Sequence, residues 1–340
     1  MKYLTLAVAT GLLLAAGSVQ AQTVSVTPLA ERAALDYAQA ARFPEWTTLI
    51  EIGGIDPVLS DRVPARLSRL GPNGEDPRIT VWADAMTALP GDSVTLYARL
   101  ERSPAGPLAA LAGAGPEPVA AESVAGTLVA EHSGELGTVQ YRDDGLGVDS
   151  VAGDGIYTAR FELPADRAPA LGQAESVLVR THALLPGNDQ REATNGFVYS
   201  NPAARLTGNI SDSVQDGDLV LSIELEVLAP GRVHLAGTLA DAGGAPFVAA
   251  QHAERLEPGL RSVELRFYGL AFHDRAISGP ATLASLAVTS TNGMPNAMHP
   301  VQSGLHVTRP IDLATLRATP FNDPLKLQAA ERLGAKLSLR

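Results

Sequence analysis

The chain is 340 residues long, and its 37 Asp and Glu residues outnumber its 26 Lys and Arg residues to give a formal net charge of −11. This acidic balance, with aromatic residues at only 5%, argues against nucleic acid or an anionic membrane as a partner, because both bind basic patches. The sequence contains no cysteine, which excludes disulfides, thiolate metal ligands and lipid attachment through a cysteine.

Residues 1–21 have the pattern of a secretory signal peptide. Lys2 comes first, a short apolar run follows from Leu4 to Ala16, and small residues lead to a cleavage position after Ala21. The apolar run is shorter than the roughly 20 residues that a spanning helix needs, so we expect no transmembrane anchor. The sequence therefore predicts export to the periplasm or the extracellular space.

Residues 22–75 are predicted to form an irregular leader that includes a helix. Residues 28–43 begin with proline, are rich in alanine and repeat apolar residues at near-helical spacing. Near the end of the leader, Arg62, Arg66 and Arg69 form a local basic run, which we interpret as a solvated surface.

From about residue 76 to residue 310, apolar and polar residues alternate in short runs separated by Pro-Gly turns. Alternation of this kind is typical of antiparallel sheets with one buried face. We therefore predict an all-β fold of two tandem immunoglobulin-like β-sandwich domains, at residues 76–200 and 201–310. The inward-facing positions that the alternation predicts are Val94, Leu96, Ala98, Leu100, Leu219, Leu221, Ile223, Leu225, Val227, Val233, Leu235, Leu239, Val263, Leu265 and Phe267.

Three further features complete the predicted organisation. Residues 103–123 are rich in Pro, Gly and Ala and indicate a long exposed loop. Trp82 lies in a strand pattern and is interpreted as a core residue. Residues 311–340 are predicted to be a partly helical tail, because Asp323 suits an N-cap and Pro324 suits the first helical position. Short helical segments are thus expected at both ends of the chain.

An acidic loop at residues 143–155 is the most distinctive feature of the sequence. Its four aspartates, with glycines between them, can supply oxygen ligands to a structural Ca²⁺ ion. The spacing does not match the helix-loop-helix calcium motif. The alternative is a turn scaffold, in which Asp side chains accept hydrogen bonds from backbone amides and Gly residues adopt positive φ. Both interpretations stay open, and the candidate metal ligands are Asp143, Asp144, Asp149 and Asp154.

The same residues carry a resemblance to a known group of proteins. The pattern Asp-Asp-Gly at residues 143–145, then Asp149, then Asp-Gly-Ile-Tyr at residues 154–157, resembles a signature of secreted bacterial tandem Ig-like proteins of choice-of-anchor or domain-of-unknown-function type. It is also similar to a loop of calcium-activated chloride channel regulator proteins. The resemblance covers residues 141–161, with a looser one over residues 231–290, and it implies an extracellular β-sandwich and little about activity.

The sequence contains no recognisable catalytic, nucleotide-binding or histidine-based metal motif. We therefore predict a non-enzymatic exported protein that acts as a binding, adhesion or structural module of the cell envelope, with a protein or cell-surface glycan as partner. Two alternatives stay open. One is a secreted hydrolase, glycosidase or protease-like, whose acids or His273 and Asp274 are assembled by tertiary structure. The other is an accessory subunit that docks through strand edges or its C-terminal helix.

Overall fold

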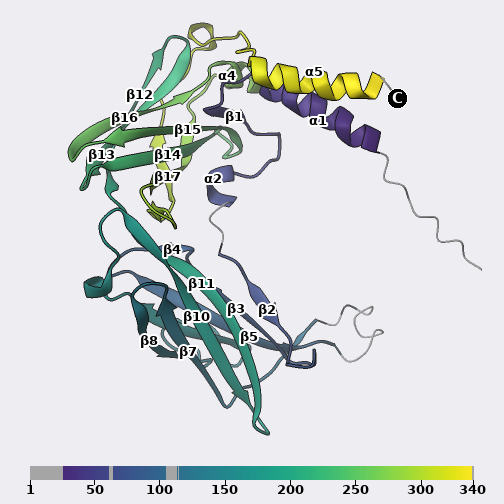
Figure 1. Cartoon of the computed structure of the whole chain (residues 1–340), viewed down its shortest axis with the longest axis vertical. Coiled ribbons are helices and arrows are strands. Elements are labelled where there is room, and N and C mark those ends of the chain that lie inside the picture. The colour runs from purple at the N-terminus through teal and green to yellow at the C-terminus, as the bar shows by residue number, and fades with distance from the viewer. Residues whose placement is uncertain (1–25, 61–63, 105–112, 114, 339–340) are drawn as a thin grey trace, which may run out of the picture. The chain divides into compact units, whose positions relative to one another are not determined.

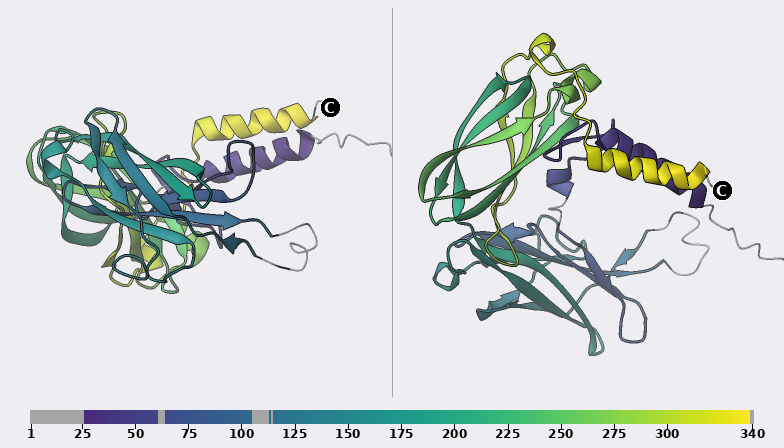
Figure 2. Two further views of the ribbon diagram at one scale, coloured as in Figure 1. Left: turned by 90° about the horizontal axis from the view of Figure 1, so that it is seen from below. Right: turned by 45° about the horizontal axis from the view of Figure 1, so that its top comes forward.

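The computed structural model describes residues 26–60, 64–104, 113 and 115–338, without the side chains of residues 335–338. It divides into two units. One holds helix α1 (Val26–Ala40) and helix α5 (Pro324–Ser338), which lie side by side (Figures 1 and 2), and the other holds all the strands. Both helices coincide with the predicted terminal helical segments. The predicted signal peptide lies outside the described residues, as does part of the predicted loop at residues 103–123. No helix in the described part of the chain has the length and apolar character to cross a bilayer.

The first sandwich packs two sheets around one core. One sheet has the order β2 (Leu67–Arg69), β3 (Arg78–Ala83), β5 (Ser93–Arg102) and β6 (Glu117–Pro118), and β9 (Ile156–Glu162) also pairs with β5. The other has the order β4 (Thr87–Ala88), β11 (Asp189–Asn201), β10 (Gln173–Leu185), β7 (Ser123–Ala130) and β8 (Gly134–Gln140). All these pairs are antiparallel except β4 with β11. The core contains Leu96 and Leu100 from the first sheet and Val177 and Val179 from the second.

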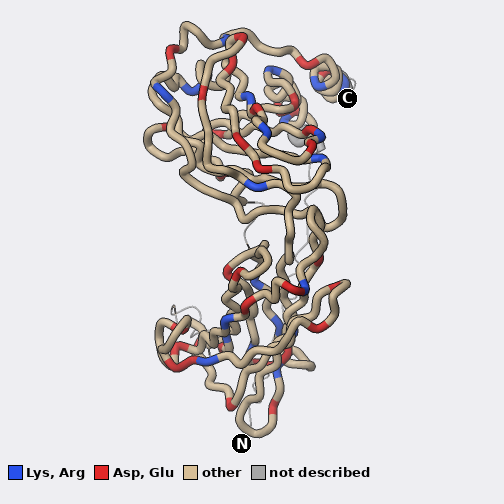
Figure 3. Tube along the Cα trace, turned by 90° about the vertical axis from the view of Figure 1, so that its left-hand side faces the viewer, with Lys and Arg blue, Asp and Glu red and all other residues tan. Residues whose placement is uncertain are grey.

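The second sandwich is built in the same way. One sheet has the order β12 (Ala204–Gln215), β13 (Asp218–Val227) and β16 (Gly259–Phe267). The other has the order β1 (Thr47–Leu49), β15 (Pro246–Leu256), β14 (Gly231–Ala240), β17 (Thr282–Ser290) and β18 (Ala297–Met298), and β19 (Gln302–Val307) also pairs with β17. The short helix α4 (Leu270–Arg275) adds Leu270 and Phe272 to the core. Acidic and basic positions are interspersed along both sandwiches (Figure 3).

Period-two alternation gives the correct inward faces, because successive side chains of a strand point to opposite sides. The predicted inward residues of β5, β13, β14 and β16 are all buried. The predicted all-β fold of two tandem β-sandwiches, with helices near the chain ends, is therefore confirmed. Trp82 is different: it alternates with the buried residues Val81 and Ala83, so it lies on the outer face of β3 and the core assignment is wrong.

The predicted irregular leader, residues 22–75, contains short strands that join the sheets of both sandwiches. Strand β1 pairs with β15 of the second sandwich, and β2 pairs with β3 of the first. After β1, at the start of helix α2 (Pro57–Ser60), the Asp56 carboxylate accepts hydrogen bonds from the hydroxyls of Thr238 (2.8 Å) and Ser285 (2.6 Å). Both hydroxyl-bearing residues are fully buried, so the leader satisfies polar groups inside the second sandwich.

Candidate functional site

The acidic loop is closed by hydrogen bonds from backbone amides to its aspartates. Asp143 spans the loop, since one carboxylate oxygen accepts from the Gly153 amide (2.7 Å) and the other from the Gly155 amide (3.1 Å). Asp149 is buried and accepts from the Gly145 amide at 2.5 Å. These three glycines have positive φ, which L side chains rarely adopt. The loop is thus organised as the turn scaffold requires.

The other two aspartates have local roles that match each other. Asp144 accepts from the Leu146 amide (3.0 Å), and Asp154 accepts from the Ile156 amide (2.9 Å), so each caps the backbone two residues further on. Within the described residues, no three acidic or histidine side chains converge closely enough to hold a metal ion. The Ca²⁺ ion on Asp143, Asp144, Asp149 and Asp154 stays a prediction.

The loop lies next to a row of side chains that strand register places on the outer face of the β2-β3-β5-β9 sheet. Trp82 pairs with Tyr97, and Tyr97 pairs with Thr158. The pairing of Leu67 with Val81 places Arg66 opposite Trp82. Residues paired across antiparallel strands point to the same face, so these side chains form one line.

The row is packed through its aromatic rings. The Trp82 and Tyr97 rings stack with their centroids 5.0 Å apart and their planes 6° from parallel. The Arg66 guanidinium carbon lies 4.7 Å from the centroid of the Trp82 ring, which is a cation–π contact. The basic run of the leader is therefore more than a solvated surface at Arg66. Arg62 lies outside the described residues.

Together the row and the loop line a cavity of about 460 Å³, here called the Trp82 pocket. Among the described residues, its carboxylates come from Asp84, Asp149 and Asp154 and its cation is Arg66, so this part of the lining has an excess of negative charge. The Thr158 hydroxyl is buried and has no hydrogen-bond partner among the described residues. Such a lining suits a ligand that carries a positive charge and an apolar surface.

Of the four predicted site residues, the structure brings Asp149 and Asp154 to this pocket and leaves Asp143 and Asp144 outside its lining. Sequence reasoning missed Arg66, Trp82, Asp84 and Tyr97 as lining residues. The sequence did contain a signal that Trp82 lies on the outer face of its strand. The alternation in residues 78–83 places Ile79, Val81 and Ala83 inward, so Trp82 points to the opposite face. No local signal indicates that Arg66 and Trp82 meet, since their contact depends on the pairing of two strands.

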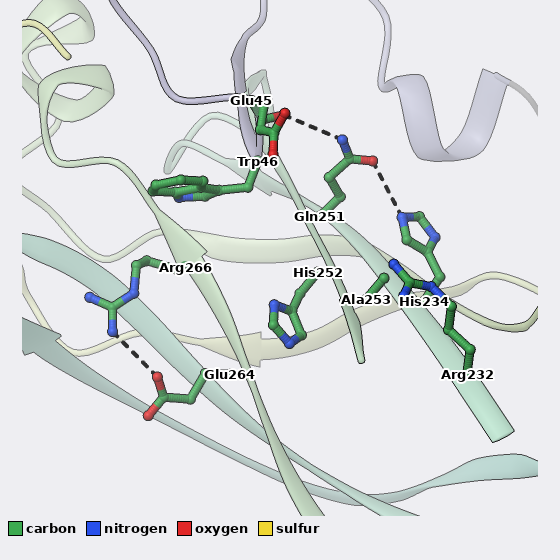
Figure 4. Close-up of a pocket in the computed structure, with 9 residues that line it drawn as sticks. All are labelled: Glu45, Trp46, Arg232, His234, Gln251, His252, Ala253, Glu264 and Arg266. Atoms are coloured by element: carbon green, nitrogen blue, oxygen red, sulfur yellow. Dashed lines mark hydrogen bonds and ion pairs between the residues drawn. The ribbon is translucent and has the colours of Figure 1, made fainter. Parts of the chain in front are cut away.

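A larger cavity, about 660 Å³, lies on the second sandwich and is here called the Trp46 pocket (Figure 4). Its lining comes from the residues before β1, from β14, from β15 and from β16, and consists of Glu45, Trp46, Arg232, His234, Gln251, His252, Ala253, Glu264 and Arg266. The chain contains two tryptophans, and each lines one of these two cavities.

The His273 and Asp274 side chains, one of the two sets of residues that the hydrolase alternative named, each contact another residue. The His273 ring nitrogen Nε2 lies 3.2 Å from the Leu316 carbonyl oxygen. One Asp274 carboxylate oxygen accepts a hydrogen bond from Arg42 at 2.8 Å. Neither contact orients one residue toward the other as a catalytic pair requires.

Comparison with known proteins shows similarity in fold alone. No protein-family model matches the chain, and no curated protein matches its sequence. A DUF4785 family protein from Legionella pneumophila subsp. pneumophila strain Philadelphia 1 superposes with a TM-score of 0.43 and 14% identity, over 70% of this chain and 57% of that one. A tetra-tandem repeat in the extending region of a large adhesion protein gives a TM-score of 0.23 and 15% identity, over 74% of this chain and 58% of that one.

A segment of two fibronectin type-III domains from chicken tenascin gives a TM-score of 0.24 and 9% identity, over 72% of this chain and 99% of that one. The chain therefore spans less than two thirds of the Legionella protein and of the adhesion-protein repeat. The strand topology itself places the fold in the class of tandem, mainly antiparallel β-sandwiches.

Proposed function

We propose that this protein is an exported, non-enzymatic binding module of the cell envelope, which holds a positively charged group of a protein or glycan partner in the Trp82 pocket. The signal-peptide pattern of residues 1–21 supports export, and the resemblance of residues 141–161 to secreted bacterial Ig-like proteins agrees with it. The observation that carries the proposal is the combination of three carboxylates with a stacked aromatic pair around one cavity.

The chemistry of the pocket supports a cationic ligand group in two ways. Asp84, Asp149 and Asp154 give it a negative potential that attracts a cation, and the aromatic faces add cation–π attraction. Arg66 already makes such a contact from within the chain, on the Trp82 ring. A ligand cation placed near Asp149 and Asp154 offsets part of the remaining negative charge.

The test uses Trp82 fluorescence in a Trp46→Phe variant, where Trp82 is the one remaining indole. The probes are trilysine, a trimer of glucosamine, and a neutral trimer of N-acetylglucosamine. We expect a saturable change with at least one of the two cationic probes, weakened by salt because the Debye length shortens, and no change with the neutral one. If neither cationic probe binds saturably, the proposal is contradicted.

Asp154→Asn and Asp144→Asn form a matched pair of variants. Both residues accept one amide hydrogen bond two residues ahead, and Asn keeps that acceptor, but only Asp154 lines the pocket. We expect Asp154→Asn to weaken the binding of a cationic probe by about tenfold, or about 1.4 kcal/mol, and Asp144→Asn to leave it unchanged. Equal effects of the two variants contradict the assignment of the site.

A further inference from the structure

The Trp46 pocket is a second cavity, and its position follows from the unequal lengths of two paired strands. Strand β1 is short and pairs only with residues 248–250 of β15, and the Trp46 carbonyl then accepts from the Gln251 amide at 2.9 Å. Beyond Gln251, strand β15 continues to Leu256 without β1 beside it. The cavity opens at this place and extends to Glu264 and Arg266 of β16.

The charges around this cavity are balanced, unlike those of the Trp82 pocket. Two acidic residues, Glu45 and Glu264, and two basic residues, Arg232 and Arg266, line the cavity. With neutral histidines, the net charge of the lining is therefore zero. Glu264 and Arg266 also form an ion pair at 3.3 Å. A balanced lining gives no net attraction for an ion, and it offers both hydrogen-bond donors and acceptors.

A fixed polar chain runs along one wall of the cavity (Figure 4). The Gln251 amide nitrogen donates to the Glu45 carbonyl oxygen at 3.3 Å, and the Gln251 amide oxygen lies 3.3 Å from Nε2 of His234. Because an amide oxygen can only accept, this contact requires the proton of His234 on Nε2. In the neutral form of the ring, the other nitrogen, Nδ1, is then an acceptor.

The tryptophan contributes an apolar wall. The Trp46 ring is half-buried, and it packs edge-to-face on Phe321 with centroids 5.9 Å apart, which fixes its orientation. Its indole nitrogen is buried and has no acceptor among the described residues, so the ring meets the cavity through its carbon surface. The negative face of an indole attracts C–H groups of a ligand.

From these features we propose that the Trp46 pocket binds an uncharged, hydroxyl-rich ligand, namely a neutral saccharide. Hydroxyls both donate and accept, so they match a lining of mixed donors and acceptors, and the C–H face of a sugar ring matches an indole. The volume of about 660 Å³ lies within the range of roughly 300–1,000 Å³ that is usual for ligand pockets. This site differs from the Trp82 pocket in position and in ligand chemistry.

The test uses a Trp82→Phe variant of the full chain, in which Trp46 is the one remaining indole. The probes are maltotriose, cellotriose and the neutral trimer of N-acetylglucosamine, titrated at low and at high salt. We expect a saturable change in Trp46 fluorescence with at least one of them, and the same affinity at both salt concentrations. Failure of all three probes to bind overturns the proposal, and so does an affinity that falls with salt.

Arg232→Ala and Arg255→Ala provide the matched variants. The two arginines are paired across β14 and β15 and both are exposed, but only Arg232 lines the cavity. We expect Arg232→Ala to weaken binding of the active probe by about tenfold and Arg255→Ala to leave it unchanged. Equal effects of the two variants overturn the placement of the site. Because the reporter is Trp46, failure here is distinguishable from failure at the Trp82 pocket.

Discussion

Replacing Asp143 by alanine tests whether hydrogen bonds alone hold the acidic loop. The Asp143 carboxylate accepts from two amides that lie 10 and 12 residues further along the chain, so it ties the start of the loop to its end. A hydrogen bond to a charged group contributes roughly 1.5–3 kcal/mol. The Gly155 contact is part-buried, whereas the Gly153 contact is exposed and water can replace it. We therefore expect the free energy of unfolding to fall by about 2–3 kcal/mol.

The assay is denaturant unfolding of the Trp46→Phe chain, followed by Trp82 emission, which reports on the first sandwich. It is performed with a chelator and again with excess Ca²⁺. Asp144→Ala is the control, because it removes one exposed hydrogen bond from a backbone amide and a 3.8 Å contact with the exposed Arg142. We expect it to lower the free energy of unfolding by less than about 1 kcal/mol. A loss for Asp143→Ala that appears only when Ca²⁺ is present refutes the hydrogen-bond reasoning and supports the calcium ion.

Three further predictions concern charged or ionisable groups that are buried or half-buried. The buried Arg191 side chain donates to the carbonyl oxygens of Pro77 (2.7 Å) and Asp76 (3.1 Å), so we expect Arg191→Ala to cost roughly 3–5 kcal/mol in denaturant unfolding, with Arg191→Lys restoring only part of it. Burial alone raises the pKa of Glu175, but hydrogen bonds from the Ser133 hydroxyl and from the amides of His132 and Ser133 lower that pKa overall. Its stabilisation is therefore present above pH 4.5 and lost as the pH falls further, and Glu175→Gln is expected to remove this acid dependence in unfolding measured as a function of pH. Burial also lowers the pKa of His299, whose Nε2 lies 2.8 Å from the Ala204 carbonyl oxygen. The free energy of unfolding should therefore decrease as the pH falls below 6.5, and His299→Gln should remove this decrease in unfolding measured as a function of pH. An unchanged pH profile in the variant contradicts this assignment.

The sequence predicts the inward faces of the strands because they depend on a local pattern. Leu100 is buried for the same reason as Ile223 and Leu225, namely that each alternates with polar neighbours along its own strand. The Trp82 pocket depends on register, which is set between strands and not within them. Arg66 meets Trp82 only because Leu67 pairs with Val81, and no period in the sequence states that pairing.

The acidic loop lies between these two cases. Its aspartates and glycines are local turn signals, and the turn-scaffold interpretation of them agrees with the hydrogen bonds of Asp143 and Asp149. The sequence does not indicate that Asp149 and Asp154 share a cavity with Trp82, because the cavity also needs β3 and β5 beneath the loop. Local chemistry therefore identified Asp149 and Asp154 in the pocket lining, and tertiary pairing supplied Arg66, Trp82 and Tyr97.

The second sandwich is built from segments that lie on both sides of the first sandwich in the sequence. Strand β1 and Asp56 precede the first sandwich in sequence, yet β1 pairs with β15, and Asp56 binds Thr238 and Ser285 across more than 180 residues. A fragment that starts at residue 201 lacks Trp46 and leaves those two buried hydroxyls without their acceptor, at a cost of roughly 1–3 kcal/mol each. The Trp46 pocket is therefore absent from such a fragment, and its ligand must be sought with a chain that contains the residues before the first sandwich as well as those after it.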